Sequence, residues 1–296
     1  MTQPDPEHSF LEINGITIHC AIQGNGPVMI LLHGFPEFWY GWRYQIPELS
    51  NQFKVIAPDL RGYNLSDKPK GVENYKIHNL VEDVRALIIA KSEEKVVLVG
   101  HDWGGVVAWE LAIRYPDLLE KLIVLNAPHP DIMEKELKYN PKQREASAYT
   151  LILRAEDGED RVSKKNYRFL RKAVFESCAD PSCFSETDRE AYMASWSQNG
   201  ALSGMLNYYR AAAILDNENG NNAEDTGKNR DGMVHVPTLV IWGQQDEALT
   251  LSLLDKLEQY VPDLKVRRIP EATHWVQHDA PSRVNEYILA FAGGNL

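Results

Sequence analysis

The chain has 296 residues, 44% of them hydrophobic and 25% charged, which is typical of a globular protein and argues against intrinsic disorder. Its net charge of −11 disfavours nucleic acids and anionic membranes as partners, because both are bound through clustered Lys and Arg. The start of the chain, MTQPDPEHSF, lacks the basic and apolar regions of a secretory leader, and no apolar stretch approaches the roughly 18 residues of a spanning helix. The chain has three cysteines and is too large to need disulfides, so we interpret them as reduced thiols. We therefore expect a cytoplasmic protein that is not bound to a membrane.

Short apolar runs alternate with amphipathic stretches along most of the chain. Residues 10–22 alternate around Asn14-Gly15, a dipeptide favoured in tight turns, and predict two antiparallel strands. Continuous apolar runs predict strands buried on both faces, at residues 28–32, 55–57, 96–99, 122–125, 238–241 and 266–269. Helical spacing of apolar residues predicts helices at 78–90 and 105–114. This alternation indicates the α/β class with a doubly wound, mostly parallel sheet.

The pattern changes between about residue 128 and residue 236. This segment is rich in charged and aromatic residues and has no comparable apolar run. It predicts amphipathic helices at 141–155, 164–176, 188–197 and 201–215, followed by a polar loop at 216–231. We therefore expect a helical cap at 129–235, inserted between two parts of one core at 1–128 and 236–296.

The heptapeptide VGHDWGG, residues 99–105, places Asp102 between a predicted strand and a predicted helix. Together with Gly100 and Gly104, Asp102 fits the sharp elbow that presents a nucleophile, which needs small neighbours to avoid clashes. The dipole and free N–H groups of the helix favour an ionised carboxylate there. Asp102 could instead simply cap the helix. Serine hydrolases carry an alcohol at this position, so the elbow indicates either an inactive site or a different reaction.

Two further residues complete a candidate triad. In hydrolases that carry such an elbow on a parallel sheet, the nucleophile, the acid and the histidine follow in that order along the chain. Asp246 comes after the strand at 238–241, with Glu247 as the alternative acid, and His274 comes after the strand at 266–269. Of the nine histidines, His33 and His101 flank glycines in predicted turns, where backbone shape explains them. His274 has the best strand-end position for a base.

A candidate oxyanion hole follows from the same turns. The strand at 28–32 runs into His33-Gly34-Phe35-Pro36, the usual source of one N–H donor in this fold, which is here Phe35. Trp103, the residue after the nucleophile, supplies the other. Cys178 and Cys183 have no Cys/His pair at zinc spacing nearby, so we expect no metal site.

Four stretches together resemble one family: HGFPEFWYGWRYQIPEL (33–49), DLRGYNLSDKP (59–69), VGHDWGGVVAWELAIRYP (99–116) and ATHWVQHDAP (272–281). They are similar to the epoxide hydrolases of the α/β-hydrolase fold, over about the first 130 and the last 60 residues. The haloalkane and haloacetate dehalogenases, which share the aspartate nucleophile, are close relatives of that family. The resemblance implies an α/β-hydrolase core with an inserted helical cap.

The resemblance also implies a reaction in two steps without metal or cofactor. Asp102 attacks an epoxide carbon and forms an alkyl-enzyme ester, and His274, oriented by Asp246, activates the water that hydrolyses this ester. The N–H groups of Phe35 and Trp103 hold the oxyanion, and a diol leaves. A carboxylate suits this elbow because attack on saturated carbon gives an ester that water can cleave, whereas a serine would form a stable ether.

Two cap tyrosines are implied as proton donors to the opening epoxide oxygen. The stretch Asn207-Tyr208-Tyr209-Arg210 matches the family's Asn-aromatic-Tyr-Arg pattern and selects Tyr209. The stretch AYTLILRAED resembles the first cap helix and selects Tyr149 by a looser match. The alternative for each is a cap tyrosine that packs its ring and hydrogen-bonds a carbonyl.

The expected substrate is an uncharged organic epoxide in an apolar pocket, which we expect to be lined by Phe35, Phe38, Trp39, Trp103 and Trp275.

One alternative is a haloalkane or haloacetate dehalogenase that uses the same nucleophile. Against it, the residue after His33-Gly34 is not the Asn that helps to hold halide, and Trp103 and Val106 stand where haloacetate dehalogenases have arginines. A second alternative is a catalytically silent ligand sensor. We expect a monomer or a homodimer.

Overall fold

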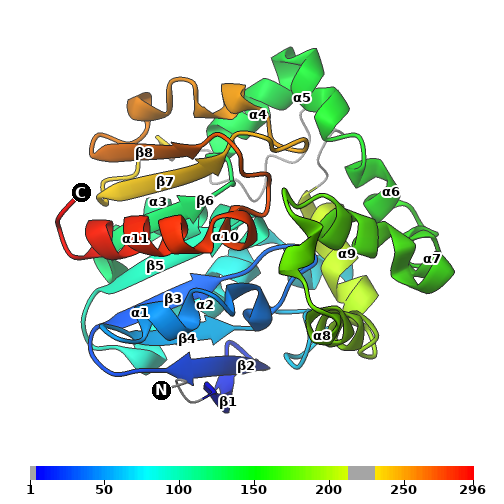
Figure 1. Ribbon diagram of the computed structural model, residues 1–296, viewed down its shortest axis with the longest axis horizontal. Helices are drawn as coiled ribbons and strands as arrows, with labels where there is room; N and C mark the ends of the chain where they lie inside the picture. The colour runs from blue at the N-terminus through cyan, green and yellow to red at the C-terminus, as the bar shows by residue number, and fades with distance from the viewer. Residues whose placement is uncertain (1–4, 213–230) are drawn as a thin grey trace.

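The computed structural model describes residues 5–212 and 231–296, which build one sheet of eight strands in the order β1-β2-β4-β3-β5-β6-β7-β8 (Figure 1). The strands are β1 (Glu7–Ile13), β2 (Ile16–Gln23), β3 (Val28–Leu32), β4 (Lys54–Pro58), β5 (Val96–His101), β6 (Leu119–Leu125), β7 (Thr238–Gly243) and β8 (Leu264–Ile269). From β4 to β8 all neighbours pair in parallel, whereas β1 with β2 and β2 with β4 pair antiparallel. The predicted strands are therefore confirmed.

The hairpin between β1 and β2 turns at Asn14 and Gly15, whose φ angles are 50° and 76°. Two successive positive φ angles are typical of the two-residue turn whose twist matches that of the strands. The turn sets the register, in which Ile13 pairs with Ile16. The predicted hairpin is confirmed.

Helices cover both faces of the sheet (Figure 1). One face carries α1 (Ile46–Leu49), α10 (Val276–Asp279) and α11 (Pro281–Ala292), and the other carries α2 (Ile77–Lys91) and α3 (Trp103–Arg114). Each of β3, β5 and β7 is buried along its whole length, which explains their continuous apolar runs. The expectation that residues 266–269 are buried on both faces is wrong for most of this strand, because β8 lies at the sheet edge and only Ile269 is fully buried.

Between β6 and β7 the chain forms the helices α4 (Pro130–Tyr139), α5 (Pro141–Ala146), α6 (Thr150–Arg154), α7 (Gly158–Arg171), α8 (Glu186–Trp196) and α9 (Ala201–Ala212). Three details differ from the predictions. The predicted helix at 141–155 is two helices with a turn at 147–149, α4 was not predicted, and α7 is interrupted by left-handed backbone at 165–167. Residues 213–215 of the predicted last helix, and most of the predicted loop at 216–231, lie outside the described residues.

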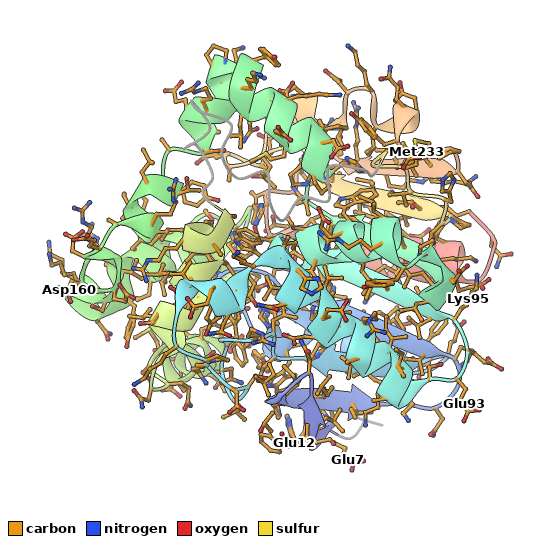
Figure 2. The ribbon with its side chains drawn as sticks, turned by 180° about the vertical axis from the view of Figure 1, so that it is seen from behind. Glu7, Glu12, Glu93, Lys95, Asp160 and Met233 are labelled. Atoms are coloured by element: carbon orange, nitrogen blue, oxygen red, sulfur yellow. The ribbon has the colours of Figure 1, made fainter. Side chains whose placement is uncertain are left out.

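Short helical turns connect these elements: η1 (Trp39–Trp42), η2 (Val72–Tyr75), η3 (Pro116–Leu118), η4 (Lys172–Glu176), η5 (Pro181–Cys183), η6 (Leu251–Leu254) and η7 (Leu257–Gln259). Figure 2 shows Lys95, the residue before β5, on the opposite side of the molecule from Asp160 of α7. The carboxyl end of β5 therefore points towards the inserted helices. In the described part of the chain, no helix is long and apolar enough to span a membrane.

The inserted helix α9 contacts the core backbone directly at Gly204. A Cβ atom at this position would lie 2.5 Å from the Gly62 carbonyl oxygen and 2.7 Å from its Cα. Gly62 itself has a φ of 88°, a conformation that favours glycine. The two glycines thus let α9, which carries Tyr209, approach the turn after β4.

We predict that Gly204→Ala destabilises the protein by about 1–3 kcal/mol, because neither backbone can yield without moving α9. Turnover falls as well, since α9 carries Tyr209. Urea unfolding and steady-state kinetics measure the two effects. Ser203→Ala, at an exposed position on the same helix, is the matched control. An unchanged unfolding free energy for Gly204→Ala would contradict the close contact.

Candidate active site

Asp102 lies at the turn between β5 and α3, in a conformation with φ 51° and ψ −121°. Glycines make room for it on both sides. A Cβ atom on Gly34 would lie 2.3 Å from the Asp102 side chain, and one on Gly104 would lie 2.3 Å from the Leu32 carbonyl oxygen. The Asp102 side chain makes no capping hydrogen bond to the described helix α3, so helix capping does not explain it. The strained turn instead presents a carboxylate that is 15% exposed.

The end of β3 holds one oxygen of this carboxylate. The backbone N–H of Phe35 donates to Asp102 Oδ1 at 2.7 Å. Because Oδ1 is engaged there, Oδ2 is the oxygen that faces His274, with 3.6 Å between Oδ2 and Nε2. The predicted donor Phe35 is thus in contact with the candidate nucleophile.

His274 lies between two carboxylates. Its Nδ1 is 2.7 Å from Asp246 Oδ2, while its Nε2 faces Asp102. The His274 side chain is 14% exposed and that of Asp246 is 1% exposed. The structure therefore brings together the three residues that chain order selected, with the histidine between the other two.

The Asp246 carboxylate is held by hydrogen bonds from several segments. Its Oδ1 accepts from the backbone N–H groups of Ala248 at 2.8 Å and Leu249 at 2.9 Å, and Asn126 Nδ2 donates to Oδ2 at 2.8 Å. Burial raises the pKa of Asp246, but the charge of His274 and these hydrogen bonds outweigh it, so the pKa is lowered and the side chain stays ionised. Asn126, at the end of β6, was not predicted; only its place at a strand end could have pointed to it.

The two carboxylates control the protonation of His274. Burial lowers the pKa of His274, but the charges of Asp246 and Asp102 and the hydrogen bond to Asp246 outweigh this effect and raise the pKa to about 10. With both carboxylates ionised, His274 is therefore an imidazolium at neutral pH.

Tyr209 and Tyr149 come from different inserted segments and meet near Asp102. The Tyr209 ring lies 5.1 Å from that of Phe35, 5.3 Å from that of Trp103 and 6.3 Å from that of Tyr149, each edge to face. Burial and the charge of Asp102 raise the pKa of both tyrosines, so both hydroxyls stay protonated and able to donate.

A buried polar network under His274 was not predicted. His101 Nε2 donates to the His274 carbonyl at 2.9 Å, and the two rings lie 4.8 Å apart. Beneath them the fully buried Glu37 bonds to His278 at 2.6 Å and to the Tyr192 hydroxyl at 2.6 Å. Burial raises the pKa of Glu37, but the histidines outweigh it and hold the pKa well below its usual range. The position of His101 inside VGHDWGG was the available signal, which we had attributed to turn shape.

The remaining predicted pocket residues contact other parts of the molecule. The Phe38 ring packs on Tyr192 at 5.2 Å, and the Trp39 ring packs on His8 of β1 at 5.0 Å. The Trp275 indole N–H donates to the Ala173 carbonyl and to Ser177 Oγ, both at 2.8 Å. Their role in lining a pocket stays a prediction. No group of three or more His, Cys, Asp or Glu in residues 5–212 and 231–296 has the arrangement of a metal site.

Comparisons with known proteins agree with this geometry. The model of the alpha/beta hydrolase fold family matches residues 27–281. The AB hydrolase superfamily protein YfhM of Bacillus subtilis (strain 168) is 42% identical over 95% of this chain and 96% of its own length. Epoxide hydrolase 3 of Xenopus tropicalis is 37% identical over 96% of this chain and 77% of its own length.

Solved structures give the same result. The crystal structure of an epoxide hydrolase from Bacillus megaterium in complex with an inhibitor superposes with a TM-score of 0.87, at 38% identity, over 96% of this chain and 100% of that one. A mutant of the Bacillus megaterium enzyme, complexed with its product (R)-3-[1]naphthyloxy-propane-1,2-diol, also superposes with a TM-score of 0.87. The chain belongs to the α/β hydrolase fold family, and within that family it is a member of the epoxide hydrolases.

Proposed function

We propose that this enzyme hydrolyses uncharged epoxides to vicinal diols through a covalent ester on Asp102, in a site covered by a cap formed by residues 129–235. One observation carries the proposal: the Asp102 carboxylate faces a histidine, and two protonated tyrosines lie near it. The relatives named as epoxide hydrolases support it, as does the structural neighbour solved with an aryloxy diol product.

In the first step, Asp102 Oδ2 attacks an epoxide carbon, because Oδ1 is occupied by the Phe35 N–H. The carbon–oxygen bond of the ring breaks and its electron pair goes to the epoxide oxygen. Tyr209 and Tyr149 then donate a proton to this alkoxide. Their raised pKa values keep both hydroxyls protonated until a strongly basic acceptor forms, and the contact between their rings, 6.3 Å apart, supports action as a pair.

In the second step, His274 takes a proton from a water molecule that attacks the ester carbonyl. Esterification removes the charge of Asp102, which is one of the two charges that raise the pKa of His274. The pKa of His274 therefore falls when the ester forms, and the imidazolium releases its proton, which restores the tyrosinate left by ring opening. The neutral imidazole can then act as the base for water. The Phe35 and Trp103 N–H groups stabilise the oxyanion on Oδ1, and the diol leaves as Asp102 is regenerated.

The surroundings of Trp103 disfavour the dehalogenase alternative. A halide needs N–H donors that point into an empty pocket, but the Trp103 ring packs edge to face against Tyr209, with 5.3 Å between the ring centres. Phe35 contributes a ring where a side-chain amide would be required. Halide release from a haloalkane without diol formation from any epoxide would reverse this choice.

We also propose a cellular location and an oligomeric state for the enzyme. The acidic charge of −11 and three thiols in a chain of this size support a cytoplasmic enzyme. We propose a monomer or a homodimer, since the triad and both tyrosines come from one chain.

We predict that His274→Gln traps the covalent ester on Asp102, because ring opening uses Asp102 and the tyrosines while ester hydrolysis needs the base. Incubation with a panel of aryl and alkyl epoxides, followed by mass spectrometry of proteolytic fragments, measures the adduct. Asp102→Asn is the control and stays unlabelled. If His274→Gln remains unlabelled by every epoxide and haloalkane tested, the silent ligand sensor gains support instead.

Tyr209→Phe and Tyr149→Phe should each slow ester formation by about 10- to 100-fold and leave ester hydrolysis nearly unchanged, because a general acid acts only on the opening oxygen. Rapid-quench measurement of ester formation in single turnovers separates the two rates. Tyr139→Phe, at an exposed position, is the control. Equal slowing of both steps would show that the tyrosines only pack.

The pKa of His274 also predicts how stability depends on pH. His274 has an ordinary pKa of about 6.5 when unfolded and about 10 in the folded enzyme, so its pairing stabilises the fold fully below pH 6.5. This contribution is lost as the pH rises from about 6.5 to 10. Urea unfolding measured from about pH 6.5 to pH 10 should show a smaller loss of unfolding free energy for Asp246→Asn than for the wild type. An identical pH slope in both proteins would contradict the assignment.

A further inference from the structure

The geometry points to Gln143, in cap helix α5, as a positioning residue that aligns the groups of both chemical steps at once. It would hold the loop that carries Asp246, which serves ester hydrolysis, and the turn that carries Tyr149, which serves ring opening. This inference rests on the proposed function, because it assigns Gln143 to the two steps of that reaction.

Asp246 depends on the backbone that follows it. The N–H groups of Ala248 and Leu249 both donate to its Oδ1, so a shift of residues 247–250 moves the carboxylate and, through it, His274. The position of the loop therefore decides where the histidine points. A misplacement of about 1 Å at reacting groups costs on the order of 100-fold in rate.

The side chain of Gln143 contacts this loop at two residues. Its Nε2 donates to the Ala248 carbonyl at 2.9 Å, and its Oε1 accepts from the backbone N–H of Thr250 at 2.9 Å and from Thr250 Oγ1 at 2.8 Å. A backbone carbonyl only accepts and a backbone N–H only donates, so these contacts define the orientation of the amide. Gln143 is fully buried, so no solvent competes for these bonds.

The same amide also contacts the turn between α5 and α6. Gln143 Nε2 donates to Ser147 Oγ at 3.0 Å, and the Ser147 N–H donates back to the Gln143 carbonyl at 2.9 Å. The Ser147 carbonyl in turn accepts from the N–H and the hydroxyl of Thr150, at 3.1 and 2.7 Å. Tyr149 lies inside this closed turn, directly before α6. One buried amide thus sets the relative placement of the acid loop and the proton donor.

A buried glutamine can also serve only to attach the cap to the core. The two steps of the reaction distinguish these roles, because mere attachment changes stability without changing the rates of the folded enzyme. Asn140 provides a matched comparison at the start of the same helix. Its Nδ2 donates to Ser252 Oγ across the same interface at 3.0 Å, while its Oδ1 caps the helix through the Lys142 N–H.

The experiment compares Gln143→Met with Asn140→Ser, a variant that keeps a capping hydroxyl but loses the Nδ2 bonds to Ser252 Oγ and Glu136 Oε2. Single-turnover rapid quench gives the rates of ester formation and ester hydrolysis, and thermal unfolding gives the stability of each variant. For Gln143→Met we expect ester hydrolysis to slow at least tenfold and ester formation at least threefold, so kcat falls more than KM changes. For Asn140→Ser we expect both rates within twofold of the wild type, despite a lower Tm.

A second variant keeps the test decisive if Gln143→Met does not fold. Thr250→Val removes the hydroxyl that donates to Gln143 Oε1 and contacts Ser252 Oγ at 2.9 Å, but keeps the backbone N–H bond, so it should slow ester hydrolysis severalfold and leave ester formation unchanged. The inference is overturned if folded Gln143→Met keeps both rates within twofold, if Asn140→Ser slows them equally, or if Thr250→Val hydrolyses the ester at the wild-type rate. Failure of the proposed function is distinct, because the wild-type enzyme itself would then form no ester on Asp102.

Discussion

The active site depends on a close contact between the ends of β3 and β5. Gly34 and Gly104 have no Cβ atoms, so the backbone after β3 can approach the strained turn that carries Asp102. This approach brings the Phe35 N–H onto Asp102 Oδ1 and leaves the other oxygen towards His274. Any larger side chain at either glycine would push the two strand ends apart. The ends of the parallel strands β3 and β5 therefore position the nucleophile directly.

The charge of Asp102 determines the protonation state of His274. One histidine shares its positive charge between two carboxylates, of which Asp246 is buried and permanently engaged, while Asp102 is partly open to the substrate. A reaction that neutralises Asp102 changes the protonation of His274 without any movement of the protein.

Sequence reasoning predicted well where local pattern decides the structure. The core strands and the hairpin at Asn14-Gly15 follow from burial and turn chemistry, and the triad follows from chain order at strand ends. It was wrong where contacts distant in sequence decide. The predicted helix at 141–155 breaks at 147–149, where Gln143 bonds both Ser147 and the loop after Asp246.

The network of His101, Glu37 and His278 has the same origin, since its members are far apart in the chain and their contacts form only in the folded protein. The same holds for Asn126. Its partner Asp246 follows the neighbouring strand of the sheet but is distant in sequence. Such polar groups are placed by the packed core, and only the assembled fold shows that they meet.

The position of the inserted helices between β6 and β7 has a consequence for how this fold can diversify. Strands β6 and β7 are neighbours in register, with Leu122 opposite Thr238, yet the whole inserted segment is spliced between them. The entropy lost on closing such a loop rises only with the logarithm of its length, by about 0.6 kcal/mol for each doubling. Lengthening or shortening the insertion therefore costs the sheet little. The core can keep its nucleophile and base while the insertion is rebuilt around substrates of different size.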